Sequence, residues 1–403
     1  MKIGKFAEEN NLTIDSIRYY MELDLLLPDK KGSQYYFDEQ CSEDVKDIIE
    51  LKKYGFKLIE IRDILYIKRL AYPITYKKNN YYKENYINKH KEVSKQIAEL
   101  RNVKNRLSNK IDEISAAKLP HRENMGIDVN ALSLLGCPIC NRNLVLKECD
   151  INGTKILSGI LKCKCGKSYL IEDGIIVSNK SEHMENPFGN DIEKFFLDYS
   201  KKSNLGFINI LTKNLRWLSK RFSKEINEDT IILELGVGYG VFLRNVYENL
   251  LDNNIYIAVD HNISVLKSLR EMLKTIDPNK IVILICSDVL DIPLKQDTVD
   301  FIIDIGGHAT NNSFLLKYID KYAKVNSVIF GSYIISNNLL KNDLIQGIDT
   351  NNFILENVKT NFKNIKYDII EEKTSKEISD IGEYELELDE NCKISNYICF
   401  LKR

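Results

Sequence analysis

The residues best suited to chemistry lie in a glycine-rich stretch near the middle of the chain. An apolar run, IILEL, leads into alternating glycines, and twenty residues after the last glycine a second apolar run ends in an aspartate. Glycines suit a strand-to-helix turn that bends tightly against a ligand, because a β-carbon there would strike the chain or the ligand. The aspartate has the spacing of a carboxylate that accepts hydrogen bonds from two ribose hydroxyls. The pattern predicts a nucleotide-binding turn, formed by Glu234, Gly236, Gly238, Gly240 and Asp260.

These residues need a sheet to position them. Two further apolar runs begin at Ile281 and Val299, and all four runs end in polar residues. Buried strands with polar carboxyl ends indicate a doubly wound parallel sheet, whose ligand crevice lies at that edge. Later segments from Ser327, Tyr367 and Asn396 are expected to add a fifth strand and a terminal antiparallel pair. The polar ends of the third and fourth runs are Asp288 with Val289, and Asp304 with His308.

Residues 225–403 resemble the class I S-adenosylmethionine-dependent methyltransferases, which have a Rossmann-like α/β fold. The resemblance implies that Glu234 and the three glycines flank the methionine part of the cofactor. It also implies that Asp260 holds the ribose, and that Asp288 and Val289 face the adenine. Dinucleotide oxidoreductases are the alternative, since they share the acidic strand end. Their usual G-x-G-x-x-G spacing differs from the one here, where the third glycine comes one residue early, as suits a cofactor without phosphate.

The methyl acceptor is expected beside the loop after the fourth strand. Methyl transfer from a sulfonium is an in-line displacement, and it needs a base only if the acceptor arrives protonated. His308 could take a proton near neutral pH while Asp304 orients the pocket, although a lone histidine in a glycine-containing loop is more often structural. The Asn/Asp-Pro-Pro-aromatic signature of amino-group methylation is absent, which favours a small-molecule acceptor. A helical cap over residues 181–224 would cover the site, with Tyr199 and Trp217 as candidate pocket residues.

Four cysteines form two closely spaced pairs ahead of this domain. Paired thiolates on two knuckles can close a tetrahedral zinc site, and such a site stabilises a module too small to fold on its own core. The segment from Tyr169 resembles zinc ribbons placed ahead of some methyltransferases, and four thiolates would leave no open position for catalysis. The C-x-C of the second pair departs from C-x-x-C, so Cys149 stays open as a substitute ligand, and reduced metal-free cysteines are the alternative. The predicted ligands are Cys137, Cys140, Cys163 and Cys165, whereas Cys41, Cys286, Cys392 and Cys399 are predicted to be packing residues.

The amino-terminal segment predicts a reader of double-stranded DNA. A short amphipathic helix is followed by a second one that begins after Thr13, a residue suited to the N-cap. Two short helices joined by a tight turn form a helix-turn-helix, whose second helix enters the major groove. A basic turn and a wing hairpin at 34–37 follow, and then helices over 43–54 and 58–67. The candidate DNA-binding residues are Thr13, Ser16, Arg18, Tyr19, Lys31 and Tyr35.

Residues 1 to about 70 are similar to the MerR family of winged-helix transcription regulators, through IGKFAEENNLTIDSIRYYMELDLLLP and DVKDIIELKKYGFKLIEIRDIL. An unrelated helical cap is the alternative. The family's wing usually presents Gly-Tyr-Arg, whereas Ser33, Gln34 and Tyr35 stand here. Losing a wing cation removes a phosphate contact, so we expect weaker or differently registered DNA binding.

A long helix is predicted to follow, because no proline or glycine occurs between Lys77 and Pro120. Apolar residues occupy heptad a and d positions, with Lys104 as the polar exception. The simpler interpretation is a helix that packs on its own domain. The heptads and the resemblance favour an antiparallel coiled coil in a homodimer, which would grip a pseudo-palindromic operator. The apolar positions are Val93, Ile97, Leu100, Leu107, Ile111 and Ile114.

Length and composition agree with a multidomain protein. The 403 residues exceed one ordinary core, and 44% apolar with 29% charged residues is typical of globular proteins. No apolar run could span a membrane and no signal-peptide pattern occurs, so a cytoplasmic protein without membrane partners is expected. Residues 1–118 hold 23 Lys and Arg against 19 Asp and Glu, a net charge of +4, which permits a DNA-binding face.

The expected fold class is therefore multidomain α+β and α/β. We expect a DNA-binding regulator whose second half binds S-adenosylmethionine and methylates or senses a small molecule. The alternatives are an enzyme with an autoregulatory DNA-binding arm and a catalytically silent sensor. The expected domains are a winged helix-turn-helix at 1–76, a coiled-coil helix at 77–118, a linker at 119–135, a zinc ribbon at 136–180, a helical cap at 181–224 and a methyltransferase domain at 225–403.

Overall fold

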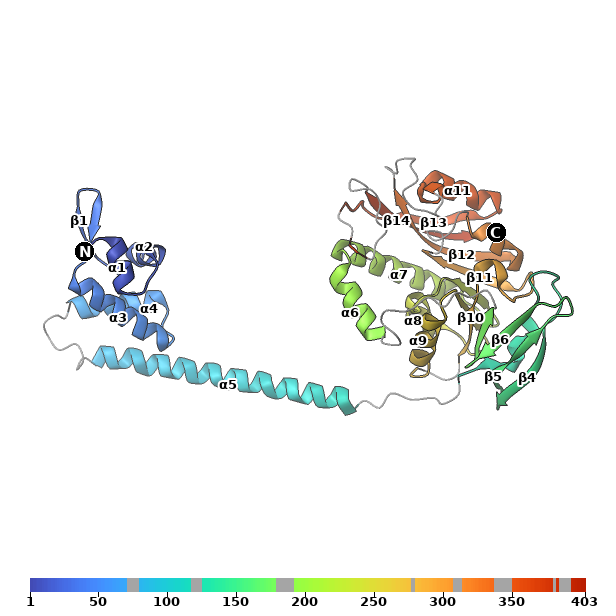
Figure 1. Ribbon diagram of the computed structural model, residues 1–403, viewed down its shortest axis with the longest axis horizontal. Helices are drawn as coiled ribbons and strands as arrows, with labels where there is room; N and C mark the ends of the chain where they lie inside the picture. Colours follow the sequence, from blue (N-terminus) through green and yellow to red (C-terminus); the bar gives the residue numbers. More distant parts are fainter. Residues whose placement is uncertain are drawn as a thin grey trace. The chain divides into compact units, whose positions relative to one another are not determined.

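The chain divides into two compact units, Met1–Lys118 and Leu119–Arg403, and each is described by itself (Figure 1). No helix in the described part of the chain is long and apolar enough to cross a membrane. The computed structural model describes residues 1–70, 80–116, 125–178, 192–276, 280–306, 314–336, 350–379, 382–383 and 393–403.

The first unit contains the expected helix-turn-helix and wing. The Thr13 hydroxyl accepts a hydrogen bond from the Ser16 amide at 3.1 Å and so starts the second helix. The wing is a two-stranded antiparallel hairpin in which Lys30 pairs with Tyr35. The elements are α1 Ile3–Glu9, α2 Ile14–Glu22, β1 Asp29–Lys31, β2 Gln34–Tyr36, α3 Glu39–Lys53, α4 Leu58–Leu70 and α5 Asn80–Ala116.

One apolar core joins the four short helices of this unit to the wing. Phe6 of α1 stacks on Phe37, which follows β2, with ring centroids 4.4 Å apart. Helix α3 begins at Glu39, four residues before the predicted start at Glu43. The reason is Asp38, whose carboxylate caps the helix by accepting a hydrogen bond from the Cys41 amide at 2.9 Å.

Helix α5 is a single 37-residue helix, and its contacts with the other described helices of the first unit lie near its start. Tyr86 packs edge-to-face on Phe56, with centroids 5.5 Å apart. The Lys89 ammonium contacts the Glu60 carboxylate at 2.8 Å. Beyond these contacts the heptad positions from Val93 to Ile114 are exposed, so the described first unit leaves this apolar stripe uncovered.

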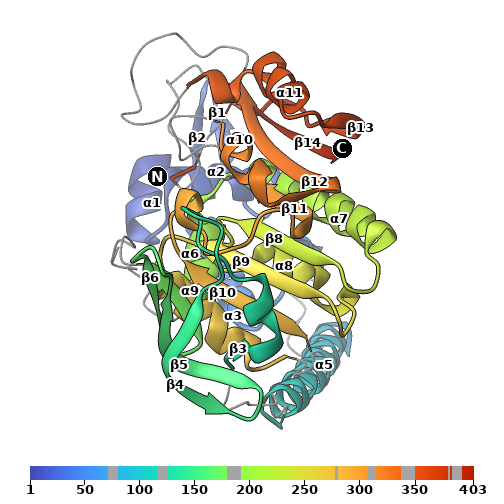
Figure 2. The same cartoon turned by 90° about the vertical axis from the view of Figure 1, so that its right-hand side faces the viewer.

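The second unit is built on one large mixed sheet (Figure 2). Strands β10, β9, β8, β11 and β12 are parallel neighbours in that order, and β14 and then β13 complete the sheet with antiparallel pairings. This is the doubly wound sheet with a terminal antiparallel pair that the sequence predicts. The strands are β8 Ile231–Leu235, β9 Ile255–Asp260, β10 Ile281–Cys286, β11 Val299–Ile305, β12 Ala323–Ser336, β13 Asp368–Thr374 and β14 Ile394–Lys402.

Alternate residues along each strand enter the cores on opposite faces of the sheet. Leu233 joins one core, which includes residues of α10 and α11, whereas Ile232 joins the other, which includes residues of α7, α8 and α9. The result is an α/β/α arrangement of layers. The helices are α6 Ile192–Lys202, α7 Leu205–Glu225, α8 Val241–Val246, η3 Tyr247–Asn249, α9 Ile263–Leu273, η4 Val289–Asp291, α10 Leu316–Ile319, η6 Asp320–Tyr322, η7 Thr350–Phe353 and α11 Leu355–Asn364.

The cysteine-bearing ribbon continues the same sheet. Its last strand, β7, pairs in parallel with β10, placing Ile175 beside Leu284 and Val177 beside Cys286. The segment 127–135, expected to belong to a linker, instead forms β3 and the 3-10 helix η2, and β3 pairs with β5. The ribbon elements are β3 Ile127–Asp128, η2 Val129–Leu134, β4 Val145–Asn152, β5 Lys155–Lys162, β6 Ser168–Glu172 and β7 Ile175–Ser178.

Candidate functional site

The glycine-rich turn joins β8 to α8 and leaves open space beside its backbone. Gly236, Gly238 and Gly240 have φ of +62°, +52° and +69°, the left-handed region that favours glycine. A β-carbon on Gly236 or Gly238 would meet no atom within 4 Å, whereas one on Gly240 would lie 2.6 Å from Leu269. The first two glycines therefore border free space, and the third allows α9 to pack closely on the turn.

Glu234 is buried directly before this turn. The Tyr256 hydroxyl donates a hydrogen bond to its Oε2 at 2.7 Å. Burial, with a smaller contribution from the Asp260 carboxylate, raises the pKa of Glu234 to about 8, against the lowering effect of the Tyr256 hydrogen bond. The side chain is therefore mostly protonated at neutral pH, and a cation placed beside it would favour the ionised form.

Asp260 ends β9 opposite the turn, with both carboxylate oxygens held by backbone amides. Its Oδ2 accepts from the Gly238 amide at 2.9 Å, and its Oδ1 accepts from the Asn262 amide at 2.9 Å. Each carboxylate oxygen can accept more than one hydrogen bond, so capacity for hydroxyl donors remains. The tertiary structure thus joins Asp260 to the glycine turn, as the spacing of twenty residues predicts.

Asp288 and Val289 form the start of η4, just beyond β10. The Asp288 carboxylate caps this short helix by accepting from the Leu290 amide at 2.7 Å. Val289 is half-buried against the core on the ribbon face. Both residues therefore lie at the same carboxyl edge of the sheet as Asp260, one strand further out.

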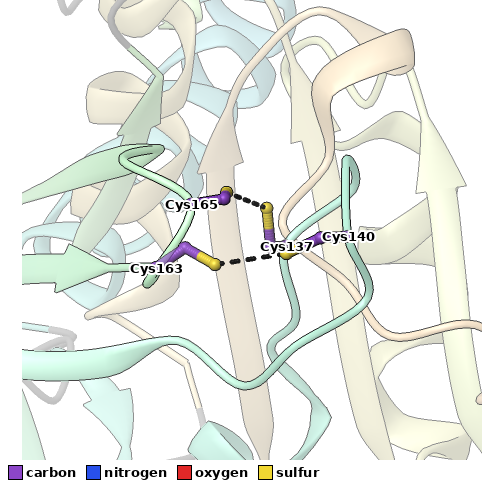
Figure 3. A group of neighbouring side chains, drawn as sticks. All are labelled: Cys137, Cys140, Cys163 and Cys165. Atoms are coloured by element: carbon purple, nitrogen blue, oxygen red, sulfur yellow. Dashed lines mark hydrogen bonds between the residues drawn. The ribbon is translucent and has the colours of Figure 1, made fainter.

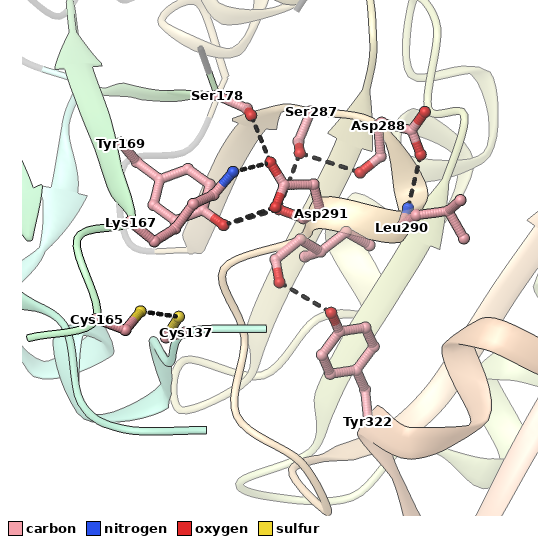
Figure 4. Close-up of polar contacts among 11 residues, drawn as sticks. Cys137, Cys165, Lys167, Tyr169, Ser178, Ser287, Asp288, Leu290, Asp291 and Tyr322 are labelled. Carbon is pink, nitrogen blue, oxygen red and sulfur yellow. Dashed lines mark hydrogen bonds and ion pairs between the residues drawn. The ribbon is translucent and has the colours of Figure 1, made fainter. Parts of the chain in front are cut away.

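Ribbon side chains fix the far end of this loop through Asp291, a residue that the sequence reasoning did not single out (Figure 4). The Asp291 carboxylate accepts hydrogen bonds from Lys167 Nζ at 2.5 Å, Tyr169 Oη at 3.1 Å and Ser178 Oγ at 2.7 Å. Ser287 Oγ also donates to the Asp291 backbone carbonyl at 3.1 Å. The sequence offers one signal for this contact, Tyr169, which resembles a tyrosine of zinc ribbons. The sequence does not indicate that its hydrogen-bond partner is Asp291.

The four predicted zinc ligands come together in the ribbon (Figure 3). Their sulfur atoms lie within 4.8 Å of one another, with Cys137 and Cys165 3.5 Å apart and Cys140 and Cys163 3.4 Å apart. A tetrahedral zinc–thiolate site, with Zn–S of about 2.3 Å, needs sulfurs about 3.8 Å apart, so the four residues fit a zinc ion.

The other described cysteines lie outside this cluster. Cys149 is exposed on β4, so it is neither a fourth ligand nor a buried thiol. Cys41, Cys286 and Cys399 are buried packing residues, as predicted. Cys392 lies outside the described residues.

A cavity of about 520 Å³ opens from the glycine turn beneath helices α6 and α7. Tyr199 lines it, as expected, whereas Trp217 packs against the core beneath α7 instead. Phe195 of α6 lies over Tyr239 of the turn, with ring centroids 4.3 Å apart. Helix α6 thus covers the glycine turn with aromatic rings.

Of the two residues proposed for acceptor chemistry, the structure describes Asp304 but not His308. His308 lies outside the described residues. Asp304 is fully buried beside Tyr333, whose pKa is raised by burial and by the Asp304 charge. Asp304 does not line the cavity, whereas its neighbour Ile305 does. Because side chains alternate along β11, Asp304 and Ile305 lie on opposite faces of the sheet. The expectation that Asp304 orients the acceptor pocket stays a prediction, because residues 307–313 lie outside the described residues.

The predicted DNA-binding residues lie on the surface of the first unit. The Arg18 side chain is 65% exposed and 3.6 Å from Asp15, and Tyr19 is also exposed. Arg18 and Tyr35 line one hollow of about 560 Å³ between α2 and the wing.

The other three candidates have intramolecular contacts. Thr13 and Ser16 hydroxyls lie 2.8 Å apart within the helix cap. The Lys31 ammonium lies over the Tyr36 ring at 5.7 Å.

The comparisons with known proteins were considered for each unit of the chain separately. Residues 1–67 match the family model described as MerR HTH family regulatory protein. The first unit carries a MerR-type helix-turn-helix domain. No curated protein sequence matches the chain. In the second unit, the strand order identifies the methyltransferase-type Rossmann-like fold, and the chain joins this fold to the MerR-type domain.

Solved structures similar to the chain overlap it only in part. A methyltransferase from Methanosarcina mazei is 12% identical, with a TM-score of 0.34 over 45% of this chain and 96% of its own. One from Aquifex aeolicus is 16% identical, with a TM-score of 0.31 over 45% and 88%. A putative sarcosine dimethylglycine methyltransferase from Galdieria sulphuraria is 13% identical, with a TM-score of 0.38 over 47% and 85%.

Proposed function

We propose that the protein is a DNA-binding regulator whose second unit binds S-adenosylmethionine and methylates a small molecule. One observation carries the cofactor half of this proposal. Two left-handed glycines border open space between a buried carboxyl group and a carboxylate that backbone amides hold in place. Such a cradle fits a cationic nucleoside that carries no phosphate.

The chain's residues divide the work of binding. Glu234 would offset the positive charge of the methionine end, because burial beside Tyr256 makes its ionisation dependent on a nearby cation. Asp260 would accept the ribose hydroxyls, and Asp288 with Val289 would border the adenine. When bound, the cofactor supplies an electrophilic methyl group. The chain would contribute orientation and exclusion of water, for which the cavity under α6 and α7 is suited.

Asp260→Ala tests the cofactor assignment. The substitution removes the acceptor for two ribose hydroxyls and also frees the Gly238 amide, so S-adenosylmethionine should bind at least about tenfold more weakly. Titration calorimetry on the full chain measures this. Asp252→Ala is the matched control, because Asp252 is an exposed acid before the same strand. Equal affinity of wild type and Asp260→Ala would refute the assignment.

A catalytically silent sensor is the second candidate function. None of the described residues that line the cavity is a histidine or lysine, and the one carboxyl group among them is Glu234. In the proposed complex Glu234 would face the positive charge of the cofactor. An acceptor that must lose a proton would then find no further carboxylate, histidine or lysine among the described residues of the wall. Transfer of tritium from labelled S-adenosylmethionine to extracted cell metabolites separates the candidates, because a silent sensor binds the cofactor and transfers none.

The first unit would act as a dimer through α5. Leu100, Leu107, Ile111 and Ile114 are each at least 60% exposed along one stripe. An apolar heptad stripe of this length is stable in water when a second helix covers it. A homodimer with an antiparallel coiled coil would hold two reading heads apart on a pseudo-palindromic duplex.

Leu107→Glu tests the dimer. A charge in the helix interface should shift the chain from dimer to monomer by at least about tenfold in dissociation constant, as measured by sedimentation equilibrium. Asn109→Glu introduces the same charge two residues later, at the heptad f position opposite the stripe, and should leave the dimer intact. A wild-type chain that sediments as a monomer would overturn the proposal.

We also propose that the four ribbon cysteines hold a structural zinc ion. Four thiolates complete a tetrahedral shell and leave no position for substrate, so the ion would stabilise the ribbon without taking part in chemistry.

A further inference from the structure

Two parts of the ribbon hold the segment that follows β10. We name residues 134–140 the first knuckle and residues 163–169 the second knuckle, and each contains two of the four clustered cysteines. Residues 287–295 are named the clasped segment. Its first part contains Asp288, which we propose borders the adenine, and its middle contains Asp291. The clasped segment therefore starts at the proposed cofactor site and runs toward the ribbon.

The first knuckle pairs with the far end of the clasped segment through backbone hydrogen bonds. The Gly136 amide donates to the Pro293 carbonyl at 3.2 Å, and the Lys295 amide donates to the Leu134 carbonyl at 2.9 Å. A β-carbon on Gly136 would lie 2.7 Å from Lys295 Cγ, so the two stretches of chain are in close contact there. Because Cys137 directly follows Gly136, its position is coupled to that of the clasped segment.

The second knuckle holds the middle of the clasped segment through side chains (Figure 4). Lys167 Nζ contacts the Asp291 carboxylate at 2.5 Å, and Tyr169 Oη donates a hydrogen bond to the same carboxylate at 3.1 Å. The side chains of Lys167 and Asp291 are 16% and 14% exposed, so solvent screens this ion pair weakly. The Cys163 amide donates to the Lys167 carbonyl at 2.8 Å, which links the ion pair to a clustered cysteine.

Local hydrogen bonds connect Asp291 to the part of the segment that would border the adenine. The Asp291 amide donates to the Asp288 carbonyl at 2.9 Å, and the Asp288 carboxylate accepts from the Leu290 amide at 2.7 Å. Ser287 Oγ donates to the Asp291 backbone carbonyl at 3.1 Å. A movement of Asp291 would therefore disturb the hydrogen bonds that hold Asp288 in place.

A zinc ion in the cysteine cluster would link the two knuckles. Two of the sulfur–sulfur contacts cross between them, Cys137 with Cys165 at 3.5 Å and Cys140 with Cys163 at 3.4 Å. Metal binding by four thiolates supplies folding free energy to modules of this kind. Because each knuckle holds one part of the clasped segment, the ion would fix that segment together with the ribbon.

We propose that metal binding by the ribbon raises the affinity of the second unit for S-adenosylmethionine, and that Asp291 is the positioning residue that couples the two sites. This inference rests on the proposed function, both for the zinc ion and for Asp288 as the border of the adenine. Asp291 would act through Asp288 and would not touch the cofactor. By thermodynamic linkage, S-adenosylmethionine would raise the affinity for zinc by the same factor.

Cofactor affinity with and without metal tests the coupling. The full chain is titrated calorimetrically with S-adenosylmethionine after loading with zinc, and again after a chelator has removed the zinc. The zinc-loaded chain should bind the cofactor at least about fivefold more tightly, the lower end of typical coupling between two sites. Competition with a chromophoric chelator measures whether the cofactor raises zinc affinity by the same factor. Equal cofactor affinity in the two forms would overturn the proposal.

Asp291→Asn tests the route of the coupling in a chain that keeps its four clustered cysteines. The substitution removes the charge that pairs with Lys167, so the zinc-loaded variant should bind S-adenosylmethionine at least about fivefold more weakly, and removal of zinc should then change cofactor affinity little. Asp300→Asn is the matched control, because Asp300 pairs with Lys324 at 2.8 Å near the amino end of β11, at the other edge of the sheet. Unchanged cofactor affinity in Asp291→Asn, or an equal loss in both variants, would overturn the proposal.

Hydrogen exchange separates failure of this inference from failure of the proposed function. Without cofactor, the amides of the clasped segment should exchange at least about fivefold faster in the metal-free chain than in the zinc-loaded chain. A chain that shows this difference but does not bind S-adenosylmethionine would refute the proposed function alone. Unchanged exchange and unchanged cofactor affinity, in a chain that binds S-adenosylmethionine, would refute this inference alone.

Discussion

The two units display their candidate recognition residues in opposite ways. In the first unit, the side chain of Arg18 is 65% exposed and Tyr19 is 51% exposed. In the second, Glu234 is 3% exposed and Asp260 is 8% exposed, and both hydrogen-bond to the fold itself. Changes in the first unit should therefore alter binding with little effect on stability. In the second, the same groups serve binding and folding, so the two effects should appear together.

The largest effect is expected at the cysteine cluster, where binding and folding are least separable. Cys137→Ser removes a fully buried sulfur from the group of four, so bound zinc should fall from about one per chain to near zero. The unfolding temperature of the second unit should fall as well. Cofactor affinity should also drop, because Lys167 and Tyr169 of the ribbon hold Asp291 at the end of the loop that we propose borders the adenine.

Elemental analysis and thermal melting measure the effects on metal content and stability. Cys149→Ser is the matched control, because Cys149 is exposed and lies outside the cluster. A Cys137→Ser chain that melts at the wild-type temperature would show that the ribbon does not depend on metal.

The next effect is expected at Arg18, where binding should change alone. A duplex that the wild-type chain selects from a random pool serves as the DNA ligand. Arg18→Ala should weaken binding to this duplex about 5- to 150-fold, the loss typical of a base-edge or well-placed phosphate contact. Fluorescence anisotropy measures this, and the melting temperature should stay unchanged. Lys5→Ala removes another exposed cation that pairs with an acid on its own helix, and it should have a much smaller effect. Equal losses in both variants would mean that α2 does not read the groove.

A further effect is expected in the pH dependence of stability, through Glu234. Its pKa is raised in the folded state to about 8 from a usual value of 4.5, so the folded chain binds more protons than the unfolded chain between these values. The free energy of unfolding should therefore decrease as pH rises from about 5 to 8. Glu234→Gln stays uncharged and should lose this part of the slope. Melting temperatures at pH 6 and pH 8 measure the difference, and identical slopes for both chains would contradict the shift.

Much of the fold follows from local sequence. Thr13 marks the start of α2 because its hydroxyl meets an amide three residues later. The apolar runs from Ile231, Ile255, Ile281 and Val299 became β8, β9, β10 and β11, because continuous apolar residues suit strands buried on both faces. The pairing of Asp260 with the glycine turn follows from the same strand spacing.

The rest depends on contacts between distant segments. Asp291 meets Ser178 across 113 positions and Lys167 across 124, and no local pattern indicates such partners. The pairing of β7 with β10 is equally non-local. The position of Asp304 after an apolar run indicates the strand end, but it does not settle which face of the sheet the side chain enters.

The parallel pairing of β7 with β10 determines which truncated fragments of the second unit keep the sheet edge covered. A fragment that began at α6 would lack β7, and the second half of β10, Leu284 to Cys286, would become an unpaired edge of the sheet. Borders of this kind recruit strands from other molecules and lead to aggregation. The ribbon therefore protects the edge strand β10 from pairing with other molecules. A shortened chain that stays soluble must begin ahead of β3.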